Sequence, residues 1–243
     1  MKRSLRAALA AALAAGLAAA VPAAAAAEFD CGANAPLGGS VRLEYAVTAT
    51  RSVLSLSGDG VFEYRREGDA YRIESSVAAI GIFEAQQSST GSVRSEGLVP
   101  RRFTLRSSRR EPRSIDFDWA GRRVSFSHTG GSEPTRPQMQ DRLSMMMQLA
   151  WRQRREPAAK SFEMPVAGPR HVSTFVFRSE GAETLTVPAG RFDSVKFERV
   201  KQGGDDEFEV WLAPALCSLP VRLRFTDDKG LVIEQRLRAV RAP

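Results

Sequence analysis

Apolar and polar side chains alternate with a period of two along most of the chain from residue 41 onward. The first such run places Val41, Leu43, Tyr45 and Val47 on one face and charged or polar residues on the other. The same alternation returns in three later segments: 71–77, 115–119 and 219–225. A period of two is typical of β-strands that bury one face. The pattern therefore predicts a mainly β protein.

Short segments typical of hairpin turns separate these runs. They include Ser57–Gly60, Glu67–Asp69, Gln202–Asp205 and Asp227–Gly230. Short turns join antiparallel neighbours, and we expect about ten strands in one sheet. A twisted antiparallel sheet of that size tends to curl or close on itself, so we expect a barrel or half-open barrel. Alternation alone does not decide whether its interior is hollow or filled.

One segment has a helical period. Leu143, Met146, Met147 and Trp151 fall at the spacing of one helix face, with Asp141 as a possible N-cap and Pro157 beyond the end. The spacing predicts one inserted α-helix over about residues 141–155. It would pack its Met/Trp stripe against an open end or face of the sheet. The preceding stretch, 129–140, is rich in Gly, Pro and polar residues and predicts a long surface connection.

The amino terminus has the pattern of an export signal. Lys2, Arg3 and Arg6 precede an Ala/Leu-rich run that ends in small residues before Glu28. That run is short and weakly apolar for an uncleaved membrane anchor, and the residues before Cys31 do not form a lipoprotein signal. We therefore predict a cleaved signal peptide over residues 1–27 and a single periplasmic domain over 28–243, without a membrane-spanning segment.

The sequence contains two cysteines, Cys31 and Cys217. In an oxidising compartment they have one possible intramolecular pairing, so we expect a disulfide between them; two free thiols are the alternative. In the chain-entropy model, so long a loop could contribute about 4 to 5 kcal/mol of stability.

Several strings, in order and spacing, resemble a known family. They are Leu43–Tyr45, Asp141–Ser144, Glu183–Phe192, Val210–Leu212 and Leu219–Arg222. Together they resemble the uncharacterised exported bacterial family named domain of unknown function 3108, over about residues 40–240. That family has no agreed activity, so the resemblance implies no catalytic residue. Its architecture is similar to the open β-barrels of periplasmic lipoprotein carriers, which implies a curved sheet around a helical lid and an apolar cavity.

Residues that would carry common catalytic or metal chemistry are scarce. The chain has two histidines, His128 and His171, and neither lies in a recognisable catalytic motif. Asp116 and Asp118 point to one face of a strand, but the opposite face carries the apolar residues, so we expect both carboxylates in solvent opposite arginines. We predict a protein that is not an enzyme, with no metal site and no cofactor.

The chain has a formal net charge of +7 and a marked cluster of arginines. The predicted patch comprises Arg101, Arg102, Arg106, Arg109 and Arg110, and the run continues to Arg113. In an exported protein such a patch would meet anionic lipid head groups or an acidic envelope protein, and not nucleic acid. The alternative is a composition rich in arginine with no function attached to its position.

The predicted apolar ligand site combines the helix stripe with one strand. Thioether side chains adapt to ligands of varied shape, although a stripe at helical spacing is also what core packing requires. The candidate residues are Leu143, Met146, Met147, Trp151, Phe117 and Trp119.

Three functions follow from these patterns. The first is a non-enzymatic binding or carrier protein for a lipid-like or acyl-bearing ligand. The second is an envelope interaction or assembly factor that contacts another protein through charge or an edge strand. The third, a hydrolase of the envelope, lacks a recognisable pair of nucleophile and base.

Overall fold

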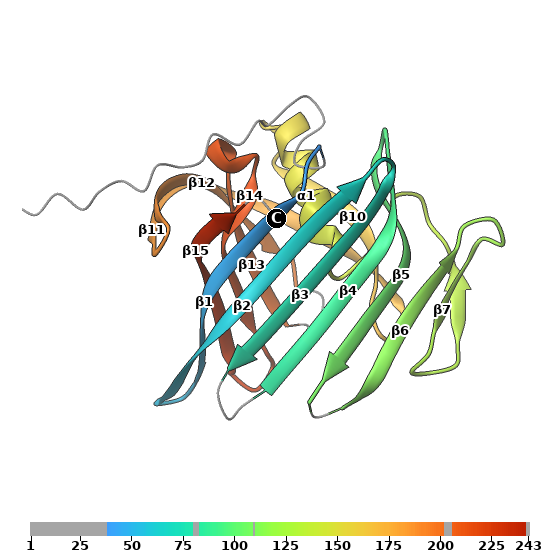
Figure 1. Cartoon of the computed structure of the whole chain (residues 1–243), viewed down its shortest axis with the longest axis horizontal. Helices are drawn as coiled ribbons and strands as arrows, with labels where there is room; N and C mark the ends of the chain where they lie inside the picture. Colours follow the sequence, from blue (N-terminus) through green and yellow to red (C-terminus); the bar gives the residue numbers. More distant parts are fainter. Residues whose placement is uncertain (1–37, 80–82, 109, 202–205, 242–243) are drawn as a thin grey trace, which may run out of the picture.

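A computed structural model describes residues 38–79, 83–108, 110–201 and 206–241. These residues form one strongly curved sheet with a single α-helix packed inside its curvature (Figure 1). The predicted signal peptide lies outside the described residues. Within the described ranges, no helix has the length and apolar character needed to cross a membrane.

The sheet contains 15 strands. The first eight are β1 (Val41–Arg51), β2 (Leu54–Glu67), β3 (Ala70–Ala79), β4 (Phe83–Arg94), β5 (Gly97–Ser107), β6 (Arg110–Asp118), β7 (Arg123–Phe126) and β8 (Ser132–Pro134). The others are β9 (Gln140–Asp141), β10 (Ser161–Ala167), β11 (Val172–Val187), β12 (Gly190–Arg199), β13 (Glu207–Ala213), β14 (Leu219–Thr226) and β15 (Val232–Arg241). The helix α1 (Ser144–Arg155) follows β9, and a short 3-10 turn, η1 (Pro214–Leu216), precedes β14.

The strand order divides the sheet into two arms that meet at the chain ends. Neighbours follow β8-β7-β6-β5-β4-β3-β2-β1-β15-β14-β13-β12-β11-β10-β9, so β1 pairs with β15 in the middle of the sheet. We call β1–β8 the first arm and β9–β15 the second arm. All pairs are antiparallel except β9 with β10. The gap between the outer strands of the two arms is the seam, across which the sheet does not close by strand pairing.

The sequence prediction of a half-open antiparallel barrel is confirmed, but the expected number of about ten strands was too low. Strand β4 has no apolar alternation because its centre is composed of Gln, Ser and Thr. Strands β7, β8 and β9 are only two to four residues long. Alternation of apolar and polar residues does not reveal strands that are polar or very short.

The segment 129–140 is more than the surface connection that its composition predicts. It contains β8 and the start of β9, and Met139 and Gln140 are fully buried. Gln140 Nε2 donates to Leu98 O at 2.8 Å, which ties the segment to β5. Its buried side chains therefore belong to the core.

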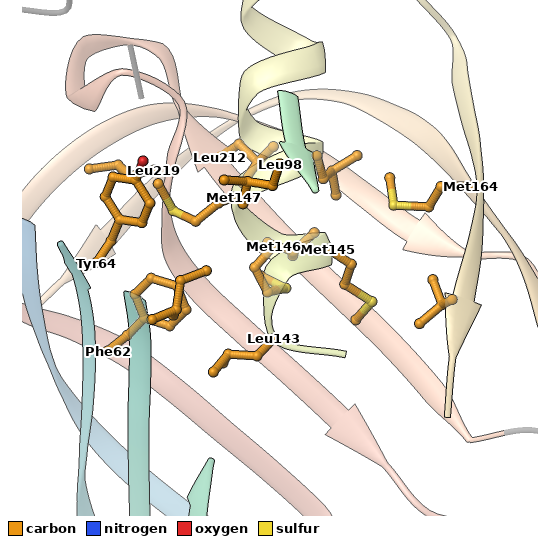
Figure 2. Close-up of a cluster of buried hydrophobic side chains, with 14 of the residues drawn as sticks. Phe62, Tyr64, Leu98, Leu143, Met145, Met146, Met147, Met164, Leu212 and Leu219 are labelled. Carbon is orange, nitrogen blue, oxygen red and sulfur yellow. The ribbon is translucent and has the colours of Figure 1, made fainter. Parts of the chain in front are cut away.

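The core lies between the inner face of the sheet and α1. The alternating residues of β1 that we predicted to be buried, Val41, Leu43, Tyr45 and Val47, are at most 4% exposed. Figure 2 shows Met145, Met146 and Met147 on the helix with apolar side chains from both arms around them. Every position from Ser144 to Ala150 is buried, because the helix lies inside the curvature of the sheet and not on its surface.

Candidate functional site

An apolar pocket of about 260 Å³ opens between the two arms. Its apolar wall is made by side chains from both arms and from the start of α1: Phe103, Leu105, Met145, Phe175, Phe208 and Phe225. Phe208 and Phe225 are direct register partners on β13 and β14, next to the β14–β15 turn. The pocket therefore lies toward that end of the barrel, where α1 does not fill the interior.

The other end of the barrel is closed by α1. Gln148 on the helix accepts from Leu98 N at 2.9 Å and donates from Nε2 to Glu96 O at 3.0 Å, which fixes the β4–β5 hairpin. On the opposite side, Ser218 of the second arm donates to Gln153 Oε1. The helix thus joins both arms, and the apolar pocket opens beside its first turn, where Met145 lines it.

Aromatic contacts hold the pocket wall in place. Phe177 packs edge-on against Phe175 and against Phe208, with ring centroids 6.3 and 6.2 Å apart. The guanidinium of Arg199 lies over the Phe175 ring, 4.5 Å from its centroid, and Arg199 Nη2 donates to Asp206 O at 2.7 Å. Phe208 and Phe225 stay partly exposed although they are on the inner face. Such half-buried rings, held by fixed neighbours, are what an apolar ligand can cover.

A buried polar network positions the helix start beside the pocket. Asp141 Oδ1 accepts from Leu143 N and Ser144 N, both at 2.8 Å, and so holds the turn that leads into the helix. The helix begins at Ser144 with Leu143 at its N-cap position, and not at Asp141 as predicted. Ser89 donates to Asp141 Oδ2 at 2.6 Å, and Tyr71 shares a 3.0 Å hydrogen bond with Ser89. Burial raises the pKa of Asp141, and hydrogen bonds from Ser89, Ser144 and Leu143 oppose that rise. The network fixes the turn that carries Arg142 and the helix start that carries Met145.

A second, polar groove of about 400 Å³ lies across β1–β5. Arg42 Nη1 contacts Glu63 Oε2 at 3.1 Å, and Arg72 Nη2 contacts Glu74 Oε1 at 2.6 Å. The pKa of Glu74 is lowered, chiefly by its hydrogen bond with Arg72. Because charges of opposite sign pair along this groove, it has less capacity to attract one type of charged ligand.

The residues predicted to bind a ligand lie in the packed core. Leu143, Met146, Met147 and Phe117 are buried, while Trp151 and Trp119 are partly buried against the same cluster. None of the six lines the apolar pocket, whereas Met145 does. Binding by these six residues stays a prediction.

The predicted arginine patch is spread over β5 and the start of β6. Arg102 Nη1 pairs with Asp116 Oδ1 at 3.0 Å, and Arg106 lines the polar groove. Arg101 is exposed, Arg109 lies outside the described residues, and Arg110 begins β6. The pairing of Arg102 with Asp116 is the arrangement that we expected for this carboxylate. The other one, Asp118, accepts from Gly121 N at 2.8 Å and shapes the β6–β7 turn.

The remaining candidates are separate from the pocket. Cys217 is buried at the end of η1, and its predicted partner Cys31 lies outside the described residues, so the disulfide stays a prediction. Both histidines are exposed. In the described part of the chain, no group of three or more His, Cys, Asp or Glu side chains is placed to hold a metal ion.

Sequence reasoning missed the aromatic wall of the pocket. The alternation of Phe175 with Phe177, and of Phe208 with Val210, was present in the sequence as a signal for an inner face. The alternation could not show that α1 leaves these rings partly uncovered, because that depends on the position of the helix between the two arms.

Comparisons with known proteins agree with the fold. One family model, described as Protein of unknown function (DUF3108), matches residues 44–236. Among solved structures, the beta-barrel-like protein of domain of unknown function DUF1849 from Brucella abortus has 10% sequence identity and a TM-score of 0.51. That match covers 83% of this chain and 97% of the other. No curated protein matches the chain significantly.

Two further solved structures are more distant. A putative outer membrane lipoprotein-sorting protein domain from Vibrio parahaemolyticus has 8% identity and a TM-score of 0.28, covering 84% of this chain and 85% of its own. A DUF1329 family protein from Desulfovibrio piger has 9% identity and a TM-score of 0.27, with the same coverage of 84% and 85%. The DUF1849 structure alone, of these three, is similar enough to define a shared fold.

Proposed function

The chain belongs to the family described as Protein of unknown function (DUF3108), and from this premise we propose that it is a non-enzymatic binding or carrier protein for a lipid-like ligand. The family has no described function, so the proposal is argued from the apolar pocket. Its ligand would place an acyl chain or a similar apolar segment among Phe103, Leu105, Phe175, Phe208 and Phe225.

One observation carries the proposal: the inner face of the half-open barrel is left partly uncovered at one end. Phe208, Phe225 and Leu105 lie on the core-facing side of their strands, yet each keeps contact with solvent. Burying apolar surface is favourable by about 0.8 kcal/mol per CH₂ group. An apolar ligand that displaces solvent from these side chains would therefore bind favourably. Inner-face rings that the described residues cover only in part are a place where a ligand can complete the core.

The pocket volume limits what can enter. At about 260 Å³ it is slightly smaller than the roughly 300–1,000 Å³ typical of small-molecule sites. It would hold a segment of an extended chain, with the rest of the ligand outside. A carrier gains from this limit, because moderate burial permits release.

We also propose an envelope location. The sequence pattern of residues 1–27 predicts export, and an exported binding protein meets lipids and acylated proteins as its available apolar ligands. If the fold is held by a Cys31–Cys217 disulfide, the oxidising periplasm is where it would form.

Titration with N-phenyl-1-naphthylamine, an uncharged apolar dye that fluoresces when it leaves water, tests the pocket. We expect saturable binding by the wild-type protein and competition by monolaurin below its aggregation concentration. Leu105→Glu places a charge in the pocket wall, and we expect at least about a tenfold loss of affinity, or 1.4 kcal/mol.

Leu54→Glu is the matched control, because Leu54 is 57% exposed at the β1–β2 turn and does not line the pocket. It should bind the dye as the wild type does, and circular dichroism should show that both variants are folded. Absence of saturable binding, or an equal loss in both variants, would refute the carrier proposal and favour the envelope interaction factor as the function.

A further inference from the structure

A larger cavity of about 490 Å³ adjoins the apolar pocket. It is lined by residues of both arms, from Arg113 on β6 to the β10–β11 turn, so it lies across the seam. The seam is bridged nearby by Val172 N, which donates to Glu133 Oε1 at 3.0 Å. We call this cavity the vestibule.

Cationic side chains converge on the vestibule from three segments that are distant in the sequence. Arg113 comes from β6, Arg142 from the turn before α1, and Arg170 with His171 from the β10–β11 turn. Asp206 and Asp228 also line it. Three arginines therefore face two carboxylates, which leaves an excess of positive charge before any histidine is protonated.

Two of these guanidinium groups have distinct surroundings. Arg142 lies against the β10–β11 turn, since its Nη2 and Nε would be 3.7 and 3.8 Å from a Cβ placed on Gly168. The Nε of Arg113 is buried and has no hydrogen-bond partner within the described ranges. Because Arg113 is a partly buried cation that lines the vestibule, an anion there would be attracted to it without contacting the Nε itself.

The vestibule and the apolar pocket adjoin each other. They share Arg142, Pro169, Phe175 and Asp206 in their walls. Phe175 contributes its ring to the apolar side, while Arg142 stands at the boundary between the two cavities. An amphiphile could thus keep its chain in the pocket while its head group reaches the arginines.

We propose that the vestibule is an anion subsite, and that the ligand is an amphiphile with a phosphate or carboxylate head group. Arg113 and Arg142 bind the head group, and Phe175 marks the point where the chain enters the apolar pocket. This inference rests on the proposed carrier function and narrows its ligand class. Arg113 and Arg142 are not among the five residues of the predicted patch, although Arg113 continues the same run, and they line the vestibule and not the polar groove.

Planar guanidinium groups suit this role. Each can donate two parallel hydrogen bonds to a phosphate or carboxylate, and groups from both arms would hold the head group across the seam. Because the vestibule is partly open to water, the attraction should weaken with added salt.

Isothermal titration calorimetry with three probes separates the possible sources of affinity. Dodecyl phosphate carries both chain and anion, monolaurin carries a chain of similar length without charge, and inorganic phosphate carries the anion alone. Each is titrated below its aggregation concentration into the purified mature chain, at low and at physiological salt.

We expect dodecyl phosphate to bind at least about tenfold more tightly than monolaurin at low salt. Arg113→Gln and Arg142→Gln should each reduce that preference by several-fold, and together abolish it, while monolaurin binding stays unchanged. Arg178→Gln, at an exposed arginine on β11 that does not line the vestibule, is the matched control and should keep the full preference. Arg113→Lys and Arg142→Lys, which keep the charge, should retain part of it and serve if a Gln variant fails to fold.

Each other result has a defined meaning. Equal affinity for dodecyl phosphate and monolaurin in the wild type would overturn the anion subsite and leave the carrier function intact. Tight binding of inorganic phosphate with no binding of either chain would support an anion site but refute the lipid-like ligand. Binding of none of the three would overturn both proposals.

Discussion

Asp141 is the residue on which the position of the helix start depends. Its carboxylate is fully buried, yet it receives two backbone N–H groups and the hydroxyl of Ser89. Burial raises its pKa above the usual 3.8, and the nearby Tyr71 has a pKa raised well above 10, also because of burial. The native state therefore holds a proton on Asp141 at pH values where the unfolded chain has lost it.

This shift gives a pH dependence of definite sign. A carboxyl with a raised native pKa binds more protons in the folded state, so its contribution to the free energy of unfolding falls as pH rises from about 3.8 through the native pKa. Asp141→Asn keeps the acceptor for Leu143 N and Ser144 N, and its amide can donate to Ser89. We expect the stability of the variant relative to wild type to increase as the pH rises from about 4 toward 8.

Urea unfolding at several pH values measures this difference. Both proteins share all other titrating groups, so subtracting one stability curve from the other isolates residue 141. Asp141→Ala is the contrasting variant, since it removes the acceptors, and we expect it to be less stable than Asp141→Asn by about 2 kcal/mol at every pH in this range. A difference between Asp141→Asn and wild type that does not change with pH would contradict the shifted pKa.

Position 97 is a second place where the structure depends on one residue, because it requires glycine. Its φ is +113°, and a Cβ at this position would stand 2.1 Å from Gln148 Oε1. We expect Gly97→Ala to lower the free energy of unfolding by more than about 2 kcal/mol, through backbone strain and loss of the helix contact. Gly68→Ala is the control, with φ +58° and open space around it, and should lose only about 1 kcal/mol. Equal losses in thermal or urea unfolding would show that Gln148 does not hold the hairpin.

At the scale of elements, α1 fills the closed end of the barrel. Met147 is fully buried in the cluster shown in Figure 2, so Met147→Ala would leave a cavity that the surrounding strands cannot fill. We expect a loss of about 2–5 kcal/mol in urea unfolding. Met147→Leu keeps the volume and should cost less than about 1.5 kcal/mol. Similar losses for the two variants would mean that the helix packs loosely.

The elements also show what the sequence could and could not predict. The alternation in β1 identified its buried residues because one face of that strand meets the core. Strand β4 gave no such signal, since Ser89 on its inner face is satisfied by Tyr71 and Asp141, which lie elsewhere in the chain. The helix end at Arg155 was predicted correctly.

The pocket could not be predicted from the sequence pattern, because it too depends on contacts between distant parts of the chain. A period of two assigns Phe208 to the inner face, but its exposure depends on where α1 stops filling the interior. The arginines of the vestibule come from β6, from the turn before α1 and from the β10–β11 turn. Only the curvature that brings the two arms together places them at one cavity.

At the scale of the whole molecule, the first and last strands are neighbours. Arg42 and Arg241 are register partners, so the two ends of the described sheet are close together. A circular permutant of residues 38–241, with a short Gly/Ser linker between the original ends and new ends between Gly68 and Asp69, should keep the fold. Both residues of the new break are exposed, in the β2–β3 turn.

Circular dichroism and dye binding compare this permutant with the linear chain of residues 38–241. We expect similar spectra and affinities, with a modest loss of stability where the β2–β3 turn is cut. A permutant that is unfolded, when the linear chain is folded, would contradict the observed pairing of β1 with β15.

The same pairing determines how the protein responds to force. Because β1 and β15 are antiparallel and adjacent, Val41 and Arg241 lie at the same end of their two strands. A pull that separates these two residues acts across the pair, so its hydrogen bonds break one after another from that end, and not all together. A protease or translocase that pulls on these two ends should therefore separate the arms at low force, and the interior would open first at its closed end.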